Sequence, residues 1–175
     1  ARYLGEKKFD YANNTMMHGI LLGFVNGLVF LVLGLLFSNV FLSLFTSDEN
    51  VIPLANTYIR ICTMFSFSVF VQIIFERIMQ ATGNAIYNMV MQGAGAIINI
   101  ILDPILIFGW FGLPEMGVAG AAIATVIGQF CAMLIGYVIT KVKIKELDIH
   151  IHNFSFSIPI LCKIYKVGVP AILMQ

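Results

Sequence analysis

Residues 16–45 read MMHGILLGFVNGLVFLVLGLLFSNVFLSLF, a long run without a single charged side chain. No charged residue lies anywhere between Asp10 and Asp48. An α-helix needs about 20 mostly apolar residues to cross the hydrocarbon core of a bilayer. This stretch is therefore predicted to be a transmembrane helix.

Three further stretches are long and apolar enough to span a membrane. They are residues 52–75, interrupted by Arg60, residues 86–110, which contain Asp103, and residues 117–140, which carry no charge. Over the whole chain 59% of the residues are hydrophobic and 11% are charged, whereas about a quarter of the residues of a soluble domain are charged. The predicted fold class is all-α, a polytopic transmembrane helical bundle.

A fifth span is expected to start near Ile158, where an amphipathic entry leads into the apolar run VGVPAILM of residues 167–174. The chain begins at Ala1 rather than at a methionine and stops at Gln175 within that apolar segment. We therefore expect both ends to be truncations of a longer protein. Four full spans and the start of a fifth are predicted in total.

The basic residues lie in alternate loops. Lys or Arg side chains occur before the first span, between the second and third spans, and after the fourth, at Arg2, Lys7, Lys8, Arg77, Lys141, Lys143, Lys145, Lys163 and Lys166. The other two loops, residues 46–53 and 111–117, carry acids and no Lys or Arg. Because basic loops stay in the cytoplasm, the N-terminal segment and the loop 141–157 are predicted to be cytoplasmic in a plasma or inner membrane. Arg60 is the one exception to this pattern.

Several classes of function lack a supporting motif. The net charge of +1 creates no field that would recruit nucleic acid. Cys62, Cys131 and Cys162 are far apart and match no metal-ligand spacing, and His150 and His152 have no third ligand nearby. No catalytic constellation or nucleotide-binding loop is present. We therefore expect neither an enzyme nor a bound cofactor.

The predicted third span carries its polar residues on one face. At 100° per residue, five residues fall within an arc of about 80°: Asn88, Gln92, Gly95, Asn99 and Asp103. Asn99 and Asp103 are four residues apart and offer an amide oxygen and a carboxylate, which suit a sodium ion or a proton. The alternative is that Asp103 only caps or breaks the helix before Pro104. The extent of the polar stripe favours a lined cavity.

Small residues form two further faces. The first span has Gly19, Gly23, Gly27 and Gly34 on one side with Asn26 beside them, and the fourth has a small face that includes Gly120, Gly128 and Thr125. Such faces let transmembrane helices approach closely. Asn26 either lines a cavity or forms a hydrogen bond between helices. Thr125 is either an ion ligand or a partner in such an interhelical hydrogen bond. Gln72 and Gln129 are not selected as site residues.

Five sequence segments carry a family resemblance. They are ARYLGEKKFDYA at 1–12, RIMQATGNA at 77–85, NIILDPILIFG at 99–109, GLPEMGVAGAAIATVIGQ at 112–129 and KVGVPAIL at 166–173. Their order and spacing resemble the multidrug and toxic compound extrusion (MATE) family, especially its prokaryotic DinF-like branch. One departure is Asn88, which stands where many members have a proline.

The resemblance implies a twelve-helix transporter with two six-helix lobes. Residues 1–145 would supply helices 3–6 of the N-terminal lobe, residues 146–157 a cytoplasmic linker between the lobes, and residues 158–175 the start of helix 7. The missing N-terminal helices and C-terminal lobe would complete the protein, and an acidic residue on the family's first helix would precede Ala1.

The resemblance also implies a function and a site. In the family an Asn and an Asp four apart on the fifth helix help to form a cation or proton site, which would be Asn99 and Asp103 here, and Thr125 matches a threonine that joins it in some members. The expected function is sodium- or proton-coupled efflux of amphipathic, often cationic, organic compounds by alternating access. The alternatives are a flippase of lipids or lipid-linked oligosaccharides from the same superfamily, and a non-transporting membrane scaffold.

Overall fold

The computed structural model describes residues 6, 9–46, 48–144 and 156–173. All regular structure in these residues is helical, as the apolar runs predict. In chain order the helices are α2 (Phe9–Ser43), α3 (Val51–Met64), α4 (Ser66–Ala81), α5 (Ala85–Ile107), the 3-10 helix η1 (Trp110–Gly112), α6 (Val118–Lys143) and α7 (Ile158–Leu173).

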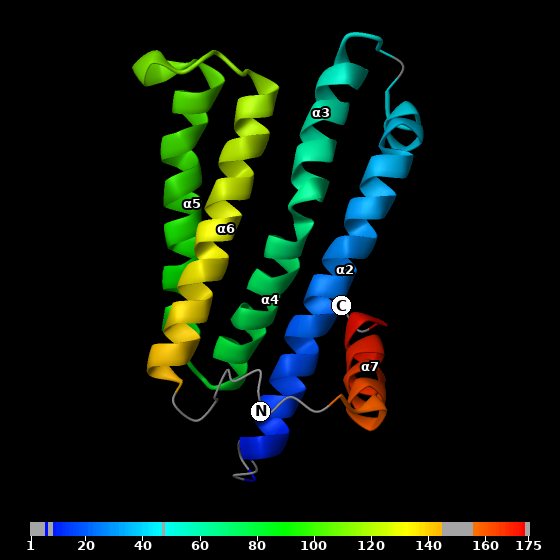
Figure 1. Cartoon of the computed structure of the whole chain (residues 1–175), viewed down its shortest axis with the longest axis vertical. Coiled ribbons are helices and arrows are strands. Elements are labelled where there is room, and N and C mark those ends of the chain that lie inside the picture. The colour runs from blue at the N-terminus through cyan, green and yellow to red at the C-terminus, as the bar shows by residue number, and fades with distance from the viewer. Residues whose placement is uncertain (1–5, 7–8, 47, 145–155, 174–175) are drawn as a thin grey trace.

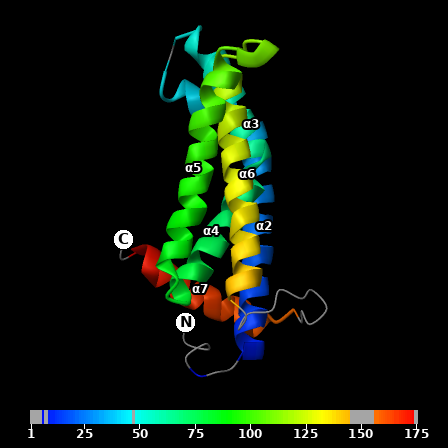
Figure 2. The same ribbon diagram turned by 90° about the vertical axis from the view of Figure 1, so that its left-hand side faces the viewer.

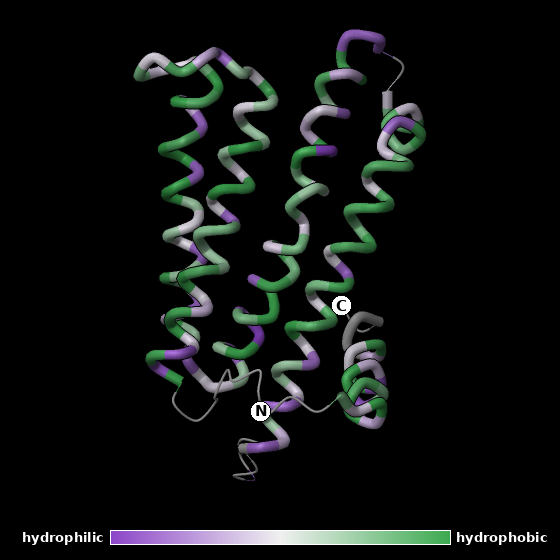
Figure 3. The backbone as a smooth tube through the Cα atoms, in the orientation of Figure 1, coloured by the Kyte–Doolittle hydropathy of each residue, from purple (hydrophilic) through white to green (hydrophobic). Residues whose placement is uncertain are grey.

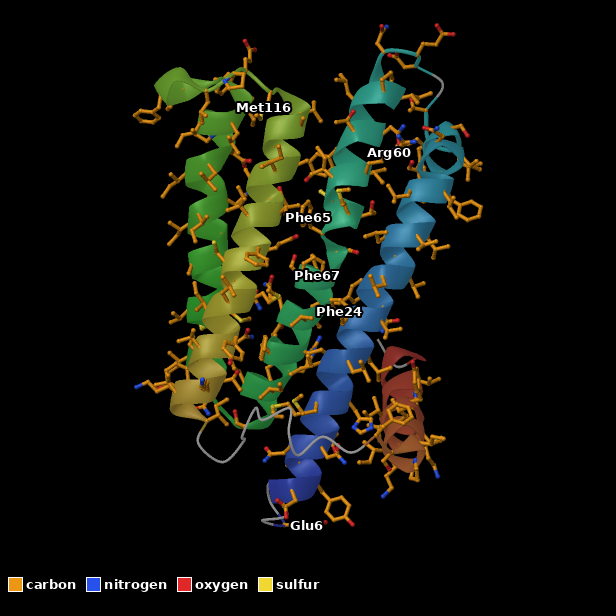
Figure 4. The ribbon with its side chains drawn as sticks, viewed as in Figure 1. Glu6, Phe24, Arg60, Phe65, Phe67 and Met116 are labelled. Atoms are coloured by element: carbon orange, nitrogen blue, oxygen red, sulfur yellow. The ribbon has the colours of Figure 1, made fainter. Side chains whose placement is uncertain are left out.

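The long helices stand side by side in one elongated bundle (Figures 1 and 2). The order across the bundle in Figure 1 is α5, α6, the α3–α4 pair and α2, while α7 lies beside the lower part of α2. Hydrophobic residues dominate the middle of the bundle and polar residues gather near the turns at its two ends (Figure 3). Glu6 and Met116 mark these opposite ends (Figure 4).

Within the described residues three single helices, α2, α5 and α6, are long and apolar enough to cross a membrane, and the α3–α4 pair makes a fourth span if its two parts are counted as one. The predicted spans 16–45, 86–110 and 117–140 fall on the three single helices. The 35 residues of α2, at about 1.5 Å per residue, extend roughly 52 Å, well beyond the roughly 30 Å of a hydrocarbon core. The ends of α2 therefore reach the membrane surfaces.

The predicted span 52–75 consists of two helices that meet at Phe65 with a bend of 54° and continue to Ala81. The Ser66 hydroxyl donates a 2.9 Å hydrogen bond to the carbonyl of Gly27 on α2, and the Ser68 hydroxyl donates to the carbonyl of Phe65. Both serines are buried. The break, where Figure 4 labels Phe65, is thus held by hydrogen bonds that hydropathy does not reveal.

The glycine face of α2 packs directly on α3 and α4, which confirms the predicted close approach. Gly19 and Gly23 lie against Ile74, Gly27 lies against the backbone of Phe67, and Gly34 lies against Thr63. Beside this seam, the rings of Phe24 and Phe67 meet edge to face with centroids 6.0 Å apart (Figure 4).

A second close contact joins α5 to α6. A methyl group on Gly95 would come within 2.9 Å of both the carbonyl oxygen of Gly128 and the Cβ of Ala132. A methyl group on Gly128 would in turn come within 2.8 Å of the Gly95 carbonyl oxygen. Only glycines allow the two backbones to lie this close.

The start of α7 is fastened to α2 through His18. The imidazole is fully buried, its Nδ1 lies 2.7 Å from the carbonyl oxygen of Asn14, and its Nε2 accepts a 2.9 Å hydrogen bond from the backbone N–H of Ser157. Phe156 stacks on the ring at 5.7 Å. One ring nitrogen faces an acceptor and the other a donor, so the imidazole links the backbone of α2 to that of Ser157. The predicted linker 146–157 lies mostly outside the described residues.

The glycine seam predicts opposite effects for two alanine substitutions in the full-length protein. Gly27→Ala places a methyl group into the Phe67 backbone and should destabilise the protein by about 1–3 kcal/mol. Gly93→Ala is the matched control, since no atom lies within 4 Å of its added methyl group, and it should be neutral or stabilising by about 0.5–1 kcal/mol. Thermal unfolding in detergent measures both, and equal melting temperatures for the two variants would contradict the packing described here.

Candidate functional site

The polar stripe of α5 forms two hydrogen-bonded pairs along the helix. The Gln92 amide donates to Asn88 Oδ1 at 3.2 Å, and one turn above Gly95 the Asn99 amide donates to Asp103 Oδ1 at 3.5 Å. Residues four apart on a helix lie above one another, so both pairs follow directly from the sequence spacing.

Thr125 on α6 joins the upper pair across the helix interface. The Asn99 Nδ2 group lies 3.4 Å from Thr125 Oγ1, while the Thr125 hydroxyl donates a 2.9 Å bond to the carbonyl of Ala121. Thr125 therefore acts as an acceptor towards Asn99. The contact is possible because Gly128, one turn further along α6, lets the Asn99 backbone and Cβ come close.

A cavity of about 230 Å³ opens below this group between α4, α5 and α6. Its wall combines amide, hydroxyl and small side chains: Gln72, Gln92, Gly95, Ala96, Asn99, Thr125, Gly128, Gln129 and Ala132. The predicted residues Gln92, Asn99 and Thr125 are thus brought together on one wall. Polar groups concentrated at membrane depth are unusual and mark functional cavities.

Gln72 and Gln129 line the cavity although sequence reasoning did not select them. Gln72 Oε1 is buried and has no hydrogen-bond partner within the described part of the chain. The available signal was that each is an amide inside an apolar helix. Nothing in a single sequence shows, however, that α4 and α6 turn these two side chains toward the α5 stripe.

Asp103 is not part of the cavity wall. Its carboxylate lies one turn beyond Asn99 and reaches the cavity through the Asn99 amide, which faces both Asp103 and Thr125. α5 does not end at Asp103 but continues through Pro104 to Ile107, one turn further on. Pro104 has no N–H, which leaves the carbonyl of Ile100 without its usual helical donor.

Two other sequence candidates lie outside this group. Asn26 is exposed on α2 and does not line the cavity. Asn88 is one turn below Gln92 and is linked to the cavity only through it. The oxygen ligands of this group are therefore the Asp103 carboxylate and the Thr125 hydroxyl, with the Asn99 Nδ2 group between them. Such hard ligands suit alkali cations, and the carboxylate can also take up a proton. Among the described residues no three His, Cys, Asp or Glu side chains gather in a metal-binding group.

Residues 1–105 match the characteristic sequence pattern of the MatE family. The chain belongs to the MatE family. It is 29% identical to the multidrug export protein MepA of Staphylococcus aureus over its whole length, and 28% identical to MepA of Staphylococcus haemolyticus over 99% of it. It spans 38% of the length of these curated relatives.

Solved structures of MATE transporters have the same helix arrangement. An inward-facing multidrug resistance MATE transporter of the MOP superfamily matches 97% of the chain with a TM-score of 0.85 and 28% identity. An outward-facing one matches 98% with a TM-score of 0.82 and 27% identity. In each case the match covers 38% of the solved chain. The MatE chain described here is therefore a helical membrane protein with the fold predicted from its sequence.

The length of the Asn99–Thr125 contact predicts how much Thr125 stabilises the helix packing, which distinguishes its two possible roles, ion ligand and interhelical hydrogen-bonding partner. At 3.4 Å it is longer, and therefore weaker, than a usual hydrogen bond, so Thr125→Val should change the free energy of unfolding by less than about 0.5 kcal/mol. Ser66→Ala removes a buried 2.9 Å interhelical bond and should cost about 1 kcal/mol. Thermal unfolding of the full-length protein compares the two, and a Thr125→Val cost equal to that of Ser66→Ala would assign Thr125 to helix packing.

Proposed function

We propose that this chain is part of a secondary active exporter that couples the inward movement of sodium ions or protons to the efflux of amphipathic, often cationic, organic compounds. The observation that carries the proposal is the Asp103–Asn99–Thr125 group beside an amide-lined cavity at the α5–α6 contact. The names of the curated relatives, multidrug export proteins, support the same function.

Asp103 is the coupling group in this proposal. A carboxylate at membrane depth is costly when it is charged and unpaired, so it favours an arrangement of the protein in which a cation or a proton neutralises it. The Asn99 amide, placed between Asp103 and Thr125, turns toward whichever neighbour accepts its hydrogen. Occupancy of Asp103 therefore changes the hydrogen bonds at the cavity wall.

Alternating access needs two arrangements that bind the ion and the exported compound with different affinities. The helices of this chain resemble an inward-facing and an outward-facing MATE structure almost equally well, with TM-scores of 0.85 and 0.82. This supports a mechanism in which these helices move largely as one body. The change of access would then lie in how this body meets the rest of the transporter.

The exported compound needs more space than this chain encloses. Binding sites for drug-sized molecules measure roughly 300–1,000 Å³, and the cavity holds about 230 Å³. We infer that the cavity accommodates an ion with its waters or one end of a substrate, and that helices outside this chain complete the binding site. No contact or cavity among the described residues favours the flippase or the scaffold alternative.

Asp103→Asn tests the coupling role because it keeps the shape of the side chain and removes its charge and its proton. The full-length variant should fold and insert normally but lose gradient-driven drug efflux, whereas Asn99→Ala should be weakened rather than inactive. Efflux from cells, normalised to the protein present at the surface, is the measurement. Glu115→Gln, an exposed acid in the α5–α6 loop, is the control and should transport normally. Wild-type efflux by Asp103→Asn would remove Asp103 from the mechanism.

We further propose that the end of the bundle bearing Lys141 and Lys143 faces the cytoplasm, as the distribution of Lys and Arg predicts. In intact cells, cysteines at the exposed positions Glu49 and Glu115 should react with a membrane-impermeant thiol reagent. A cysteine at Lys143, exposed at the opposite end of α6, should react only after the membrane is permeabilised. Labelling of the Lys143 position in intact cells would reverse the orientation. Lys8 and Lys145, which the same charge pattern places inside, lie outside the described residues.

A further inference from the structure

The loop between α5 and α6 is closed at its neck and presents aromatic side chains at its tip. The backbone N–H groups of Met116 and Gly117 bond to the carbonyls of Leu106 and Ile107 at 3.2 and 3.1 Å. Within this loop Phe111 has φ 60°, and it is the only residue other than glycine with a positive φ in the described part of the chain. A phenylalanine rarely adopts this left-handed conformation.

The result is a small cluster of exposed rings. Phe111 is 88% exposed, Phe108 61% and Trp110 55%. The rings of Phe108 and Trp110 lie against each other with centroids 6.4 Å apart. Large apolar groups that gather at the surface mark a contact with a partner or with a membrane.

The position of the cluster on α5 indicates what covers it. The exposed apolar residues of α5 form a stripe without any charge, made up of Ile86, Met89, Val90, Ile97, Ile100 and Ile101. At 100° per residue this stripe is centred roughly opposite the polar stripe that contains Gln92 and Asn99. Phe108, just past the end of α5, continues the apolar stripe. In Figure 1, η1 also projects beyond α5 on the side away from α6.

A membrane helix turns its polar stripe to a cavity and its apolar face to lipid. On this rule the apolar stripe of α5 is expected to face lipid, and the aromatic cluster to lie at the level where that side meets the membrane surface. Trp and other aromatic side chains concentrate at this depth, where a ring can rest among acyl chains while an indole N–H reaches the polar headgroups.

We propose that Phe108, Trp110 and Phe111 form an interfacial anchor that inserts into the bilayer surface at the end of the bundle opposite Lys141 and Lys143. The partner is the lipid itself, at the boundary between headgroups and acyl chains. The closed neck fixes the tip relative to α5 and α6, so the anchor sets the depth of this helix pair in the membrane. This role is separate from the proposed transport, and its test does not depend on efflux.

The test is a nitroxide attached at Phe111→Cys in full-length protein that lacks its native cysteines, reconstituted in phosphatidylcholine vesicles. Collision rates with oxygen, which concentrates in lipid, and with a water-soluble nickel chelate report the depth of the label. The ratio of the oxygen collision rate to the nickel-chelate collision rate should be several-fold higher for the label at position 111 than for the same label at Glu115. Glu115 is an exposed position four residues along the loop.

Each other outcome overturns the proposal. Collision with the nickel chelate equal to that at Glu115 would place the tip in water. Low collision rates with both reagents would place it against another part of the protein. A second experiment keeps Phe111 and attaches the nitroxide at Leu113→Cys. The label is then compared with and without the double substitution Phe108→Ser, Trp110→Ser, which should move it toward water. An unchanged ratio at Leu113 would show that the rings do not hold the loop in the membrane.

Discussion

The backbone contact between α5 and α6 at Gly95 and Gly128 is the constraint on which the candidate site depends. Without side chains at these positions the helices approach until a Cβ would touch the opposing carbonyl oxygen. That distance brings Asn99 of one helix within reach of Thr125 of the other. Below the contact the helices leave room for a cavity whose walls carry amides. The same small residues therefore allow the close approach of α5 and α6 and leave space for the polar cavity next to it.

Much of the fold was predictable because the membrane imposes simple length and composition rules. Long apolar runs with at most one charged residue predicted α2, α5 and α6. The spacing of Asn99 and Asp103 predicted their contact, since residues four apart on a helix are neighbours in any environment. The glycine face of α2 was also visible, because small residues at helical spacing have few other uses in a membrane.

The remaining features depend on how one helix is turned relative to another. Gln72 and Gln129 belong to the cavity because α4 and α6 rotate them towards α5, whereas Asn26 is exposed although it neighbours a packed glycine. Beside the break at Phe65, Ser66 bonds to the Gly27 carbonyl, a contact that links positions 39 residues apart. A single sequence contains the donors and acceptors but not the pairing.

The hydrogen bond between the Ser157 N–H and His18 has a consequence for the order in which contacts can form during synthesis. Its two partners are separated by 139 positions, whereas α5 and α6 are joined by a short loop and can pair as soon as both have been synthesised. Contacts between distant parts of a chain form late, because the intervening segment has to be made and placed first. The hydrogen bond between His18 and Ser157 can therefore form only after α2 to α6 have all been synthesised. Among the contacts of these helices it is one of the last that becomes possible, and its formation requires that the start of α7 has docked on α2.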